Sequence, residues 1–125
     1  MKKKTKGQLE AEISEALVKF EKEYMGRGPT ETKTYIIEDT IFVRLKGVLT
    51  PAEQHLSSSS NGAMLIKQVR SQLLEKARNL LEDVIKNLTT AKVISMHSDI
   101  STKTGERVII FILNENLEAK FTSKG

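Results

Sequence analysis

The chain has 125 residues and no cysteine, so it is long enough for one domain with a hydrophobic core, and disulfides, thiol nucleophiles and cysteine-ligated zinc are excluded. The formal charge of +4 comes from four lysines among the first six residues, and the remaining 16 basic and 16 acidic residues balance. A duplex-binding domain usually carries its excess positive charge as a folded patch, and we therefore expect no nucleic-acid partner.

Membrane insertion is not expected either. No apolar run reaches the roughly 18–20 residues that cross a bilayer, and no signal-peptide core follows the first lysines. We therefore expect a cytoplasmic protein. Residues 1–6 are predicted to be a solvated basic tail. The alternative is weak attraction to an anionic membrane surface, which would hold the protein peripherally at the inner face of the membrane.

Residues 7–25 are predicted to form a helix, because apolar residues recur at helical spacing with glutamates and lysines opposite. Gly26 can adopt the left-handed conformation that ends a helix, and Pro29 cannot continue one, so the helix should stop there. The apolar stripe consists of Leu9, Ile13, Ala16, Leu17, Phe20 and Tyr24.

Residues 32–49 carry β-branched and aromatic residues on both sides of Glu38-Asp39, which predicts a hairpin. Glu-Asp is a poor type I′ pair because both central residues need positive φ, so a longer loop or one bent strand are the alternatives. One side of the hairpin collects Ile36, Ile41, Val43 and Leu45, and the other collects Tyr35, Ile37, Phe42 and Arg44.

A second helical region is predicted from residue 51 to residue 88. Thr50, Pro51 and Glu53 form the signature of a capped helix start, and the serine-rich loop at residues 57–62 interrupts it. Residues 63–88 then predict one helix of about 39 Å at ~1.5 Å per residue. A globule of this size is only roughly 36 Å across. We expect the helix to span the whole domain or to overhang it, and an overhanging apolar stripe, which needs a partner, favours a homodimer.

Residues 93–101 and 106–114 predict a second hairpin. Alternation places Ile94, Met96, Ile100, Ile109, Phe111 and Leu113 on a core face. Its other face is mixed, with His97 and Asp99 on one strand and Val108 and Ile110 on the other. Such a face is typical of a dimer interface, a partner-binding sheet or a shallow ligand site, and these four residues are the candidate interface.

The predicted fold is an α+β two-layer sandwich of order helix-strand-strand-helix-strand-strand, with a roughly four-stranded antiparallel sheet and helices on one face. One domain is expected over residues 7–118, followed by a C-terminal tail at 119–125.

The sequence does not favour catalysis. His97 and Asp99 could be a base with its orienting carboxylate, or two metal ligands, but no nucleophile or third ligand stands at a supporting spacing. We expect a non-enzymatic protein with no metal and no cofactor.

Four residues are candidates for binding an anion or a partner: Arg27, Gly28, Arg44 and Arg70. Arg27 lies beside two glycines and a proline, which fits such a site. The alternative is that its cation simply stabilises the C-terminal end of the preceding helix.

Nearly the whole chain, about residues 5 to 118, resembles a family of small bacterial proteins described as MpsC-like, after a Na+-translocating, membrane-potential-generating system. The strongest pieces are Gly26 through Pro29, Gly47 through Glu53, Arg70, and Asp99 in the last hairpin, while the Ser57–Ser60 run departs from the family pattern. The resemblance implies a soluble accessory protein that serves membrane transport machinery for cations or inorganic carbon. It implies no catalytic residues.

The leading hypothesis is therefore a homodimeric accessory or regulatory protein with an integral membrane transporter as partner. It would dock through the mixed sheet face or through Arg27 and its neighbours. A small-molecule or anion sensor built on Arg27, Arg44 and Arg70 is the alternative, and a nucleic-acid-binding protein is the third possibility.

Overall fold

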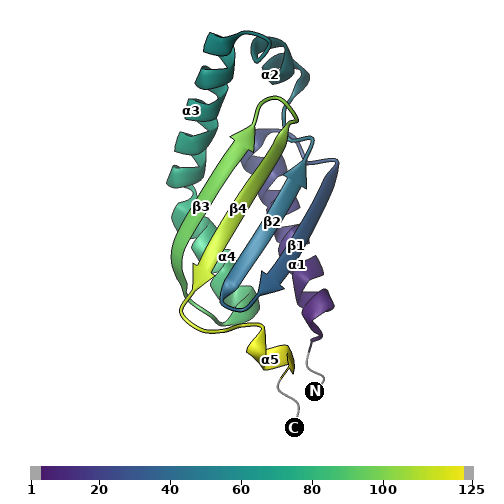
Figure 1. Cartoon of the computed structure of the whole chain (residues 1–125), viewed down its shortest axis with the longest axis vertical. Coiled ribbons are helices and arrows are strands. Elements are labelled where there is room, and N and C mark those ends of the chain that lie inside the picture. The colour runs from purple at the N-terminus through teal and green to yellow at the C-terminus, as the bar shows by residue number, and fades with distance from the viewer. Residues whose placement is uncertain (1–3, 123–125) are drawn as a thin grey trace.

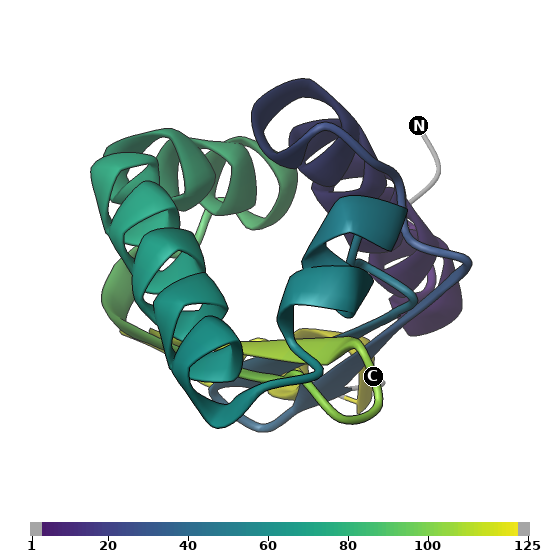
Figure 2. The same ribbon diagram turned by 90° about the horizontal axis from the view of Figure 1, so that it is seen from above.

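The structure, a computed structural model, describes residues 4–122 and forms two layers (Figure 1). Four antiparallel strands form one sheet in the order β1-β2-β4-β3. The helices cover one face of this sheet, and Figure 2 shows that no helix within residues 4–122 lies over the other face. The predicted α+β sandwich is confirmed. The elements are α1 (Lys6–Phe20), the π-helix η1 (Glu21–Met25), β1 (Glu31–Ile37), β2 (Thr40–Lys46), α2 (Pro51–Leu56), α3 (Ser60–Lys76), α4 (Arg78–Thr89), β3 (Val93–Ser101), β4 (Glu106–Leu113) and α5 (Ala119–Thr122).

The core lies between the sheet and the helices. Strand alternation turns every second side chain of β2 and β4 toward the helices, as expected from the period of two. Burying side chains of this size is worth about 1.5–3 kcal/mol each, and this burial fixes the register. The inward strand residues are Ile36, Ile41, Val43, Leu45, Ile109, Phe111 and Leu113, and they pack with Leu9, Ile13 and Leu17 of α1 and Leu81 and Ile85 of α4.

The first strand of the second hairpin departs from simple alternation at its start. The pairing with β4 shifts between Val93 and Ser95, so Ile94 is the extra residue of a bulge. Val93 is buried and Ile94 is 58% exposed. The prediction that Ile94 faces the core is therefore wrong, whereas Ile100, Ile109, Phe111 and Leu113 are buried as predicted.

The single helix predicted for residues 63–88 is wrong, because the chain turns between α3 and α4. Ala77 has φ −92° and ψ 4°, outside the α-helical region, and it separates the two helices. Residues 63–88 therefore form no single helix of about 39 Å, and the overhang that favoured a dimer is absent from this part of the chain. α3 begins earlier than predicted, at Ser60, because the Ser59 hydroxyl accepts a hydrogen bond from the Gly62 N–H at 3.0 Å and caps it.

The first helix widens into a π-helix before it ends. The stripe of Leu9, Ile13 and Leu17 continues to Glu21, which is fully buried, whereas Tyr24 is 54% exposed. The wider turn of a π-helix rotates the last residues out of the α-helical pattern, which removes Tyr24 from the predicted stripe. Gly26 ends the element with φ 86°, as predicted.

The first hairpin closes with two residues, which decides between the alternatives. Ile37 pairs with Thr40, and Glu38 alone of the two turn residues has positive φ, at 56°. The turn is therefore not type I′. The C-terminal segment holds it, because the Glu38 N–H donates to Glu118 Oε1 at 2.8 Å and the Glu118 N–H donates to the Glu38 carbonyl at 3.1 Å.

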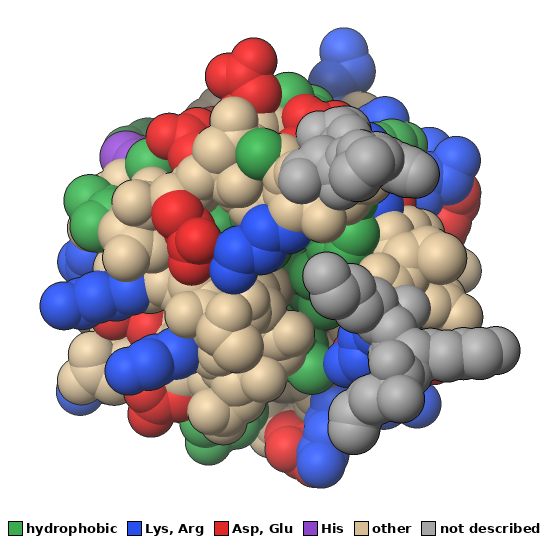
Figure 3. All heavy atoms as spheres, turned by 90° about the horizontal axis from the view of Figure 1, so that it is seen from below, with side chains coloured by type: hydrophobic (Ala, Val, Ile, Leu, Met, Phe, Trp, Pro, Cys, Tyr) green, Lys and Arg blue, Asp and Glu red, His purple; other side chains and the backbone are tan. Residues whose placement is uncertain are grey.

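The two chain ends leave from the same end of the molecule, seen from below in Figure 3. Charged side chains of both signs are mixed over this end, and apolar side chains are visible in a recess. Of the lysines in the predicted basic tail at residues 1–6, the structure describes Lys4 and Lys6. Lys4 pairs with Glu12 at 2.6 Å, and Lys6 pairs with Glu118 at 2.9 Å. Residues 1–3 and 123–125 of the predicted tails lie outside the described residues.

Candidate functional site

The uncovered face of the sheet, which we call the open face, is the first candidate. It consists of the outward side chains of the four strands, and it combines apolar and charged groups. Tyr35 is 38% exposed and Ile37 53% exposed, while Phe42, Ile110 and Ile112 are half-buried. Apolar side chains gathered on one face of a sheet without a covering layer indicate an interface.

The four candidate interface residues lie together on this open face. His97 pairs with Ile110 across β3 and β4, and Asp99 pairs with Val108. The two polar residues therefore face solvent beside an aliphatic strand, in the register that alternation predicts.

His97 and Asp99 do not act on one another. His97 Nε2 lies 3.0 Å from Ser95 Oγ, while Asp99 Oδ1 accepts from the Ile100 N–H at 2.8 Å and lies 3.4 Å from Lys67 Nζ. Within residues 4–122, no three His, Asp or Glu side chains lie close enough together to hold a metal ion. This geometry fits contact residues better than a base and its orienting carboxylate.

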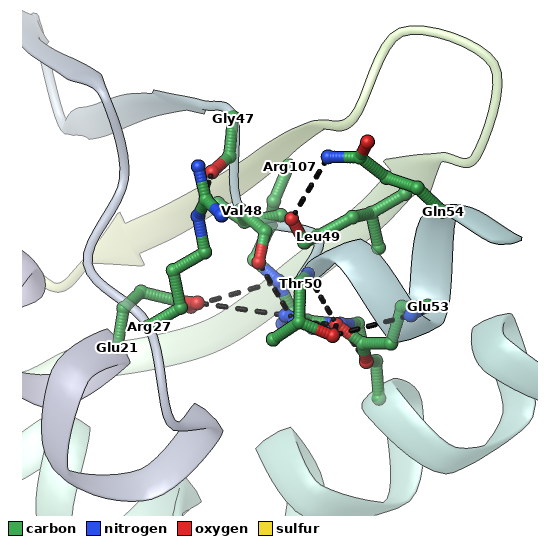
Figure 4. A network of polar contacts seen from close by, with 10 residues as sticks. Glu21, Arg27, Gly47, Val48, Leu49, Thr50, Glu53, Gln54 and Arg107 are labelled. Atoms are coloured by element: carbon green, nitrogen blue, oxygen red, sulfur yellow. Dashed lines mark hydrogen bonds and ion pairs between the residues drawn. The ribbon is translucent and has the colours of Figure 1, made fainter.

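The second candidate is a buried ionic cluster of Glu21, Glu53, Arg70 and Arg107, drawn in Figure 4. The side chains of Glu21, Arg70 and Arg107 are at most 2% exposed. They come from η1, from the inward face of α3 and from the inward face of β4. The cluster therefore joins both layers at the end of the molecule where α2 lies.

Arg70 makes the well-formed contacts of the ionic cluster. Its Nε and Nη2 donate to the two carboxylate oxygens of Glu53 at 3.0 and 2.8 Å, a bidentate pair. Nη2 also donates to the Val48 carbonyl at 2.9 Å. Glu53 accepts from the Thr50 N–H at 2.9 Å, which completes the predicted capping box of α2.

Glu21 and Arg107 are paired more loosely. Glu21 Oε1 lies 3.5 Å from Arg70 Nη1, and Oε2 lies 3.7 Å from Arg107 Nε. Among the described residues, none of these four atoms has a hydrogen-bond partner. Glu21 thus balances the charge of two arginines without directional bonds, which leaves part of the cost of burying it uncompensated.

The pKa shifts of Glu21 and Arg107 reflect the cost of burying their charges. Burial raises the pKa of the Glu21 carboxyl although Arg107 and Arg70 oppose the change. Burial also lowers the pKa of the Arg107 guanidinium against the attraction of Glu21. Burial alone would raise the pKa of Glu53, but the hydrogen bonds from Arg70 and from the Thr50 N–H lower it overall.

Arg27 and Arg70 hold neighbouring carbonyls of the loop between β2 and α2. Arg27 Nε donates to the Gly47 carbonyl at 3.2 Å, and Arg70 binds the next carbonyl along, that of Val48. Gly28 lies against the side chain of Lys22, where a Cβ would approach Lys22 Cε to 2.9 Å. Arg27 thus lies just beyond the end of η1 and also holds the loop between β2 and α2.

Arg44 lies elsewhere. It points outward from β2 on the open face, where its Nε is 2.6 Å from Glu106 Oε2. The structure therefore brings Arg27 and Arg70 to the same loop but leaves Arg44 apart, and the three arginines do not converge on one anion site.

Sequence reasoning singled out Arg70 but missed Glu21 and Arg107. A signal was present for each. Glu21 continues the i, i+4 series of Leu9, Ile13 and Leu17, and Arg107 occupies an inward position two residues before Ile109.

The fold and the two candidate sites define a small α+β protein with an uncovered sheet face and an internal ionic cluster. The chain belongs to the family described as Na+-translocating membrane potential-generating system (MpsC), whose profile matches residues 5–115. The resemblance noted in the sequence is confirmed.

Two relatives come from Bacillus subtilis (strain 168). The uncharacterized protein YbcI is 48% identical over 116 residues, which cover 93% of this chain and 94% of YbcI. The uncharacterized protein YrhF is 23% identical over 108 residues, covering 86% of this chain and 88% of YrhF. No solved structure matches the chain. None of the helices within residues 4–122 combines the length and apolar character needed to cross a membrane.

Proposed function

We propose that the protein is a non-enzymatic accessory or regulatory component of a membrane cation or inorganic-carbon transport system, and that it acts as a cytoplasmic homodimer. The open face is the observation that carries this proposal. Exposed Tyr35 and Ile37 and half-buried Phe42, Ile110 and Ile112 offer a surface for another protein, and His97 and Asp99 border it with polar contacts.

The family description supports the biological setting of the proposal. It names a membrane-potential-generating system that translocates Na+. An accessory role needs protein contacts rather than a reactive centre. The ionic cluster fits this role, because it joins elements of the fold and its members Glu21, Arg70 and Arg107 are closed to solvent.

A deletion strain of the native host tests this function. Deletion should reduce the Na+-dependent part of the membrane potential, measured with a voltage-sensitive dye. The wild-type gene should restore it, and Phe42→Glu should not, because a carboxylate on the open face opposes burial of that face. An unchanged potential in the deletion strain would contradict the proposed function.

Met64→Glu is the matched control. It also replaces an apolar residue with glutamate, but Met64 is 64% exposed on α3, in the helical layer. This variant should restore the potential as the wild type does. Immunoblots must show equal amounts of both variants, so that loss of the protein is not mistaken for loss of contact.

A further inference from the structure

The open face is divided into an apolar half and a charged half by the strand register. Rows of outward residues run across the sheet, because each strand pairs in register with the next. Two rows near the Glu38-Asp39 turn carry most of the apolar side chains: Tyr35, Phe42 and Ile110 in one, Ile37 and Ile112 in the other.

The charged half lies at the other end of the strands, and its signs are distributed unevenly. On β1 and β2, Lys33, Arg44 and Lys46 are positive and Glu31 is negative. On β3 and β4, Asp99 and Glu106 are negative. Lys33, Arg44, Val108 and Asp99 form one row. Lys46 lies in the next row, which Ser101 and Glu106 share. Within the chain, Glu31 lies 3.5 Å from Lys33 and 3.8 Å from Lys46, and Arg44 lies 2.6 Å from Glu106. The three basic residues and one acidic residue of β1 and β2 leave a net charge of +2 on that side of the sheet's midline, and the two acidic residues leave −2 on the other side.

We infer that the open face binds the open face of a second copy, about a two-fold axis that runs parallel to the strands between β2 and β4. This inference rests on the homodimer of the proposed function and specifies its geometry. Rotation about such an axis keeps every row opposite the same row and exchanges β1 with β3 and β2 with β4. Two sheets packed face to face with their strands nearly aligned are a common arrangement.

This rotation makes the two faces complementary. Lys33 lies opposite the partner's Asp99, and Lys46 lies opposite the partner's Glu106. Phe42 meets the partner's Ile110, so the apolar half packs on itself near the axis. No two of the charges in these rows face a like charge, because Arg44 lies opposite the partner's Val108 and Glu31 opposite the partner's Ser101.

A two-fold axis perpendicular to the strands gives a poorer interface. It reverses the order of the rows, so full overlap places Lys33 and Arg44 on the partner's Tyr35 and Phe42. Lys33 and Arg44 would then be buried against apolar side chains with no opposite charge from the partner, which is unfavourable. The open face is thus complementary to itself about the axis parallel to the strands and not about the perpendicular one. For this reason we assign a second copy of the chain, in this orientation, as the binding partner of the open face.

The size of the open face also fits. Four strands at about 4.8 Å spacing and four rows at about 6.8 Å span roughly 500 Å² in plan. The relief of the side chains increases this figure toward the ~600 Å² per partner at which specific, stable interfaces begin.

Crosslinking tests the axis directly, because the chain has no cysteine of its own. Tyr35 and His97 lie on the two edge strands of one sheet, about 14 Å apart at three strand spacings. In the dimer Tyr35 faces the partner's His97. The double variant Tyr35→Cys/His97→Cys should therefore form covalent dimers with a short bismaleimide in high yield, and each single variant should form few.

The double variant Lys33→Cys/Tyr35→Cys is the matched control, since these residues face one another between copies only if the axis is perpendicular to the strands. Efficient dimers from this control, and few from Tyr35→Cys/His97→Cys, would overturn the axis. Few dimers from both, with the wild-type chain dimeric by light scattering, would overturn the geometry but leave the homodimer of the proposed function intact.

Charge reversal gives a second measurement that needs no crosslinker. Lys33→Asp and Asp99→Lys should each raise the Kd of the dimer about three- to tenfold, because each places like charges opposite one another. The double variant should restore the wild-type Kd. If the double variant instead raises the Kd by the product of the two single fold-changes, the pairing of Lys33 with the partner's Asp99 is overturned.

Discussion

Replacing Glu21 with alanine should lower the free energy of unfolding by about 3–5 kcal/mol, the usual cost of leaving a buried charge without its partner. Arg107 Nε would lose the carboxylate 3.7 Å away, and Arg70 would lose the one 3.5 Å from its Nη1 and keep only Glu53, in a region closed to solvent. A domain of this kind is stable by only ~5–15 kcal/mol, so the variant should be close to unfolding. Urea denaturation followed by circular dichroism measures the change.

Glu23→Ala is the control for this prediction. Glu23 lies two residues further along η1 and is exposed, so its loss should change stability by less than about 0.5 kcal/mol. Equal stability of Glu21→Ala and Glu23→Ala would show that the ionic cluster does not hold the layers together.

A double-mutant cycle separates the charge balance from simple loss of packing. Arg107→Met should also destabilise the protein, because it leaves Glu21 with Arg70 alone. The double variant Glu21→Ala/Arg107→Met retains the bidentate pair of Arg70 with Glu53. It should lose less stability than the two single changes added together, by about 0.5–3 kcal/mol. Strict additivity would contradict the coupling of Glu21 and Arg107.

Replacing Gly62 with alanine should destabilise the protein by about 1–3 kcal/mol, although alanine ordinarily favours a helix over glycine by ~1 kcal/mol. Gly62 lies in the first turn of α3, buried against the end of α2. A Cβ there would meet the Leu56 carbonyl oxygen at 1.9 Å, and this is a backbone atom that a side-chain rotation cannot move. Thermal denaturation measures the change.

Gly7→Ala supplies the control of opposite sign. Gly7 also lies in the first turn of a helix, α1, but the nearest atom to its Cβ would be Thr5 Oγ1 at 4.0 Å. The change should leave stability unchanged or raise it by up to about 1 kcal/mol. A stabilising Gly62→Ala would mean that α2 and α3 are not packed as the structure has them.

The strands and the start of α2 could be predicted because each is determined locally. Alternation of apolar residues assigns the faces of β2 and β4, and Thr50 with Glu53 fixes the start of α2. The break at Ala77 could not be predicted, since apolar residues recur at helical spacing through the whole of residues 63–88 and so predict one continuous helix. Tertiary packing of α3 beside β3 and of α4 beside α1 overrides that pattern.

Of the two candidate sites, the open face could also be predicted from local sequence, and most of the ionic cluster could not. The mixed character of the open face follows from parity, except at Ile94, where a bulge of one residue reverses the side. The ionic cluster depends on three separate elements meeting, so Arg70 was visible as a candidate but its partners Glu21 and Arg107 were not identified. Family membership came from resemblance over the whole chain, and no local motif supplies it.

Light scattering on the full chain at tens of micromolar tests the central claim, that the open face is the interface of a homodimer. The expected mass is twice the 14.0 kDa of one chain. Phe42→Glu should shift it toward 14.0 kDa, while Met64→Glu should remain dimeric. A wild-type chain that is monomeric at this concentration, or a Phe42→Glu variant that stays fully dimeric, would contradict the account.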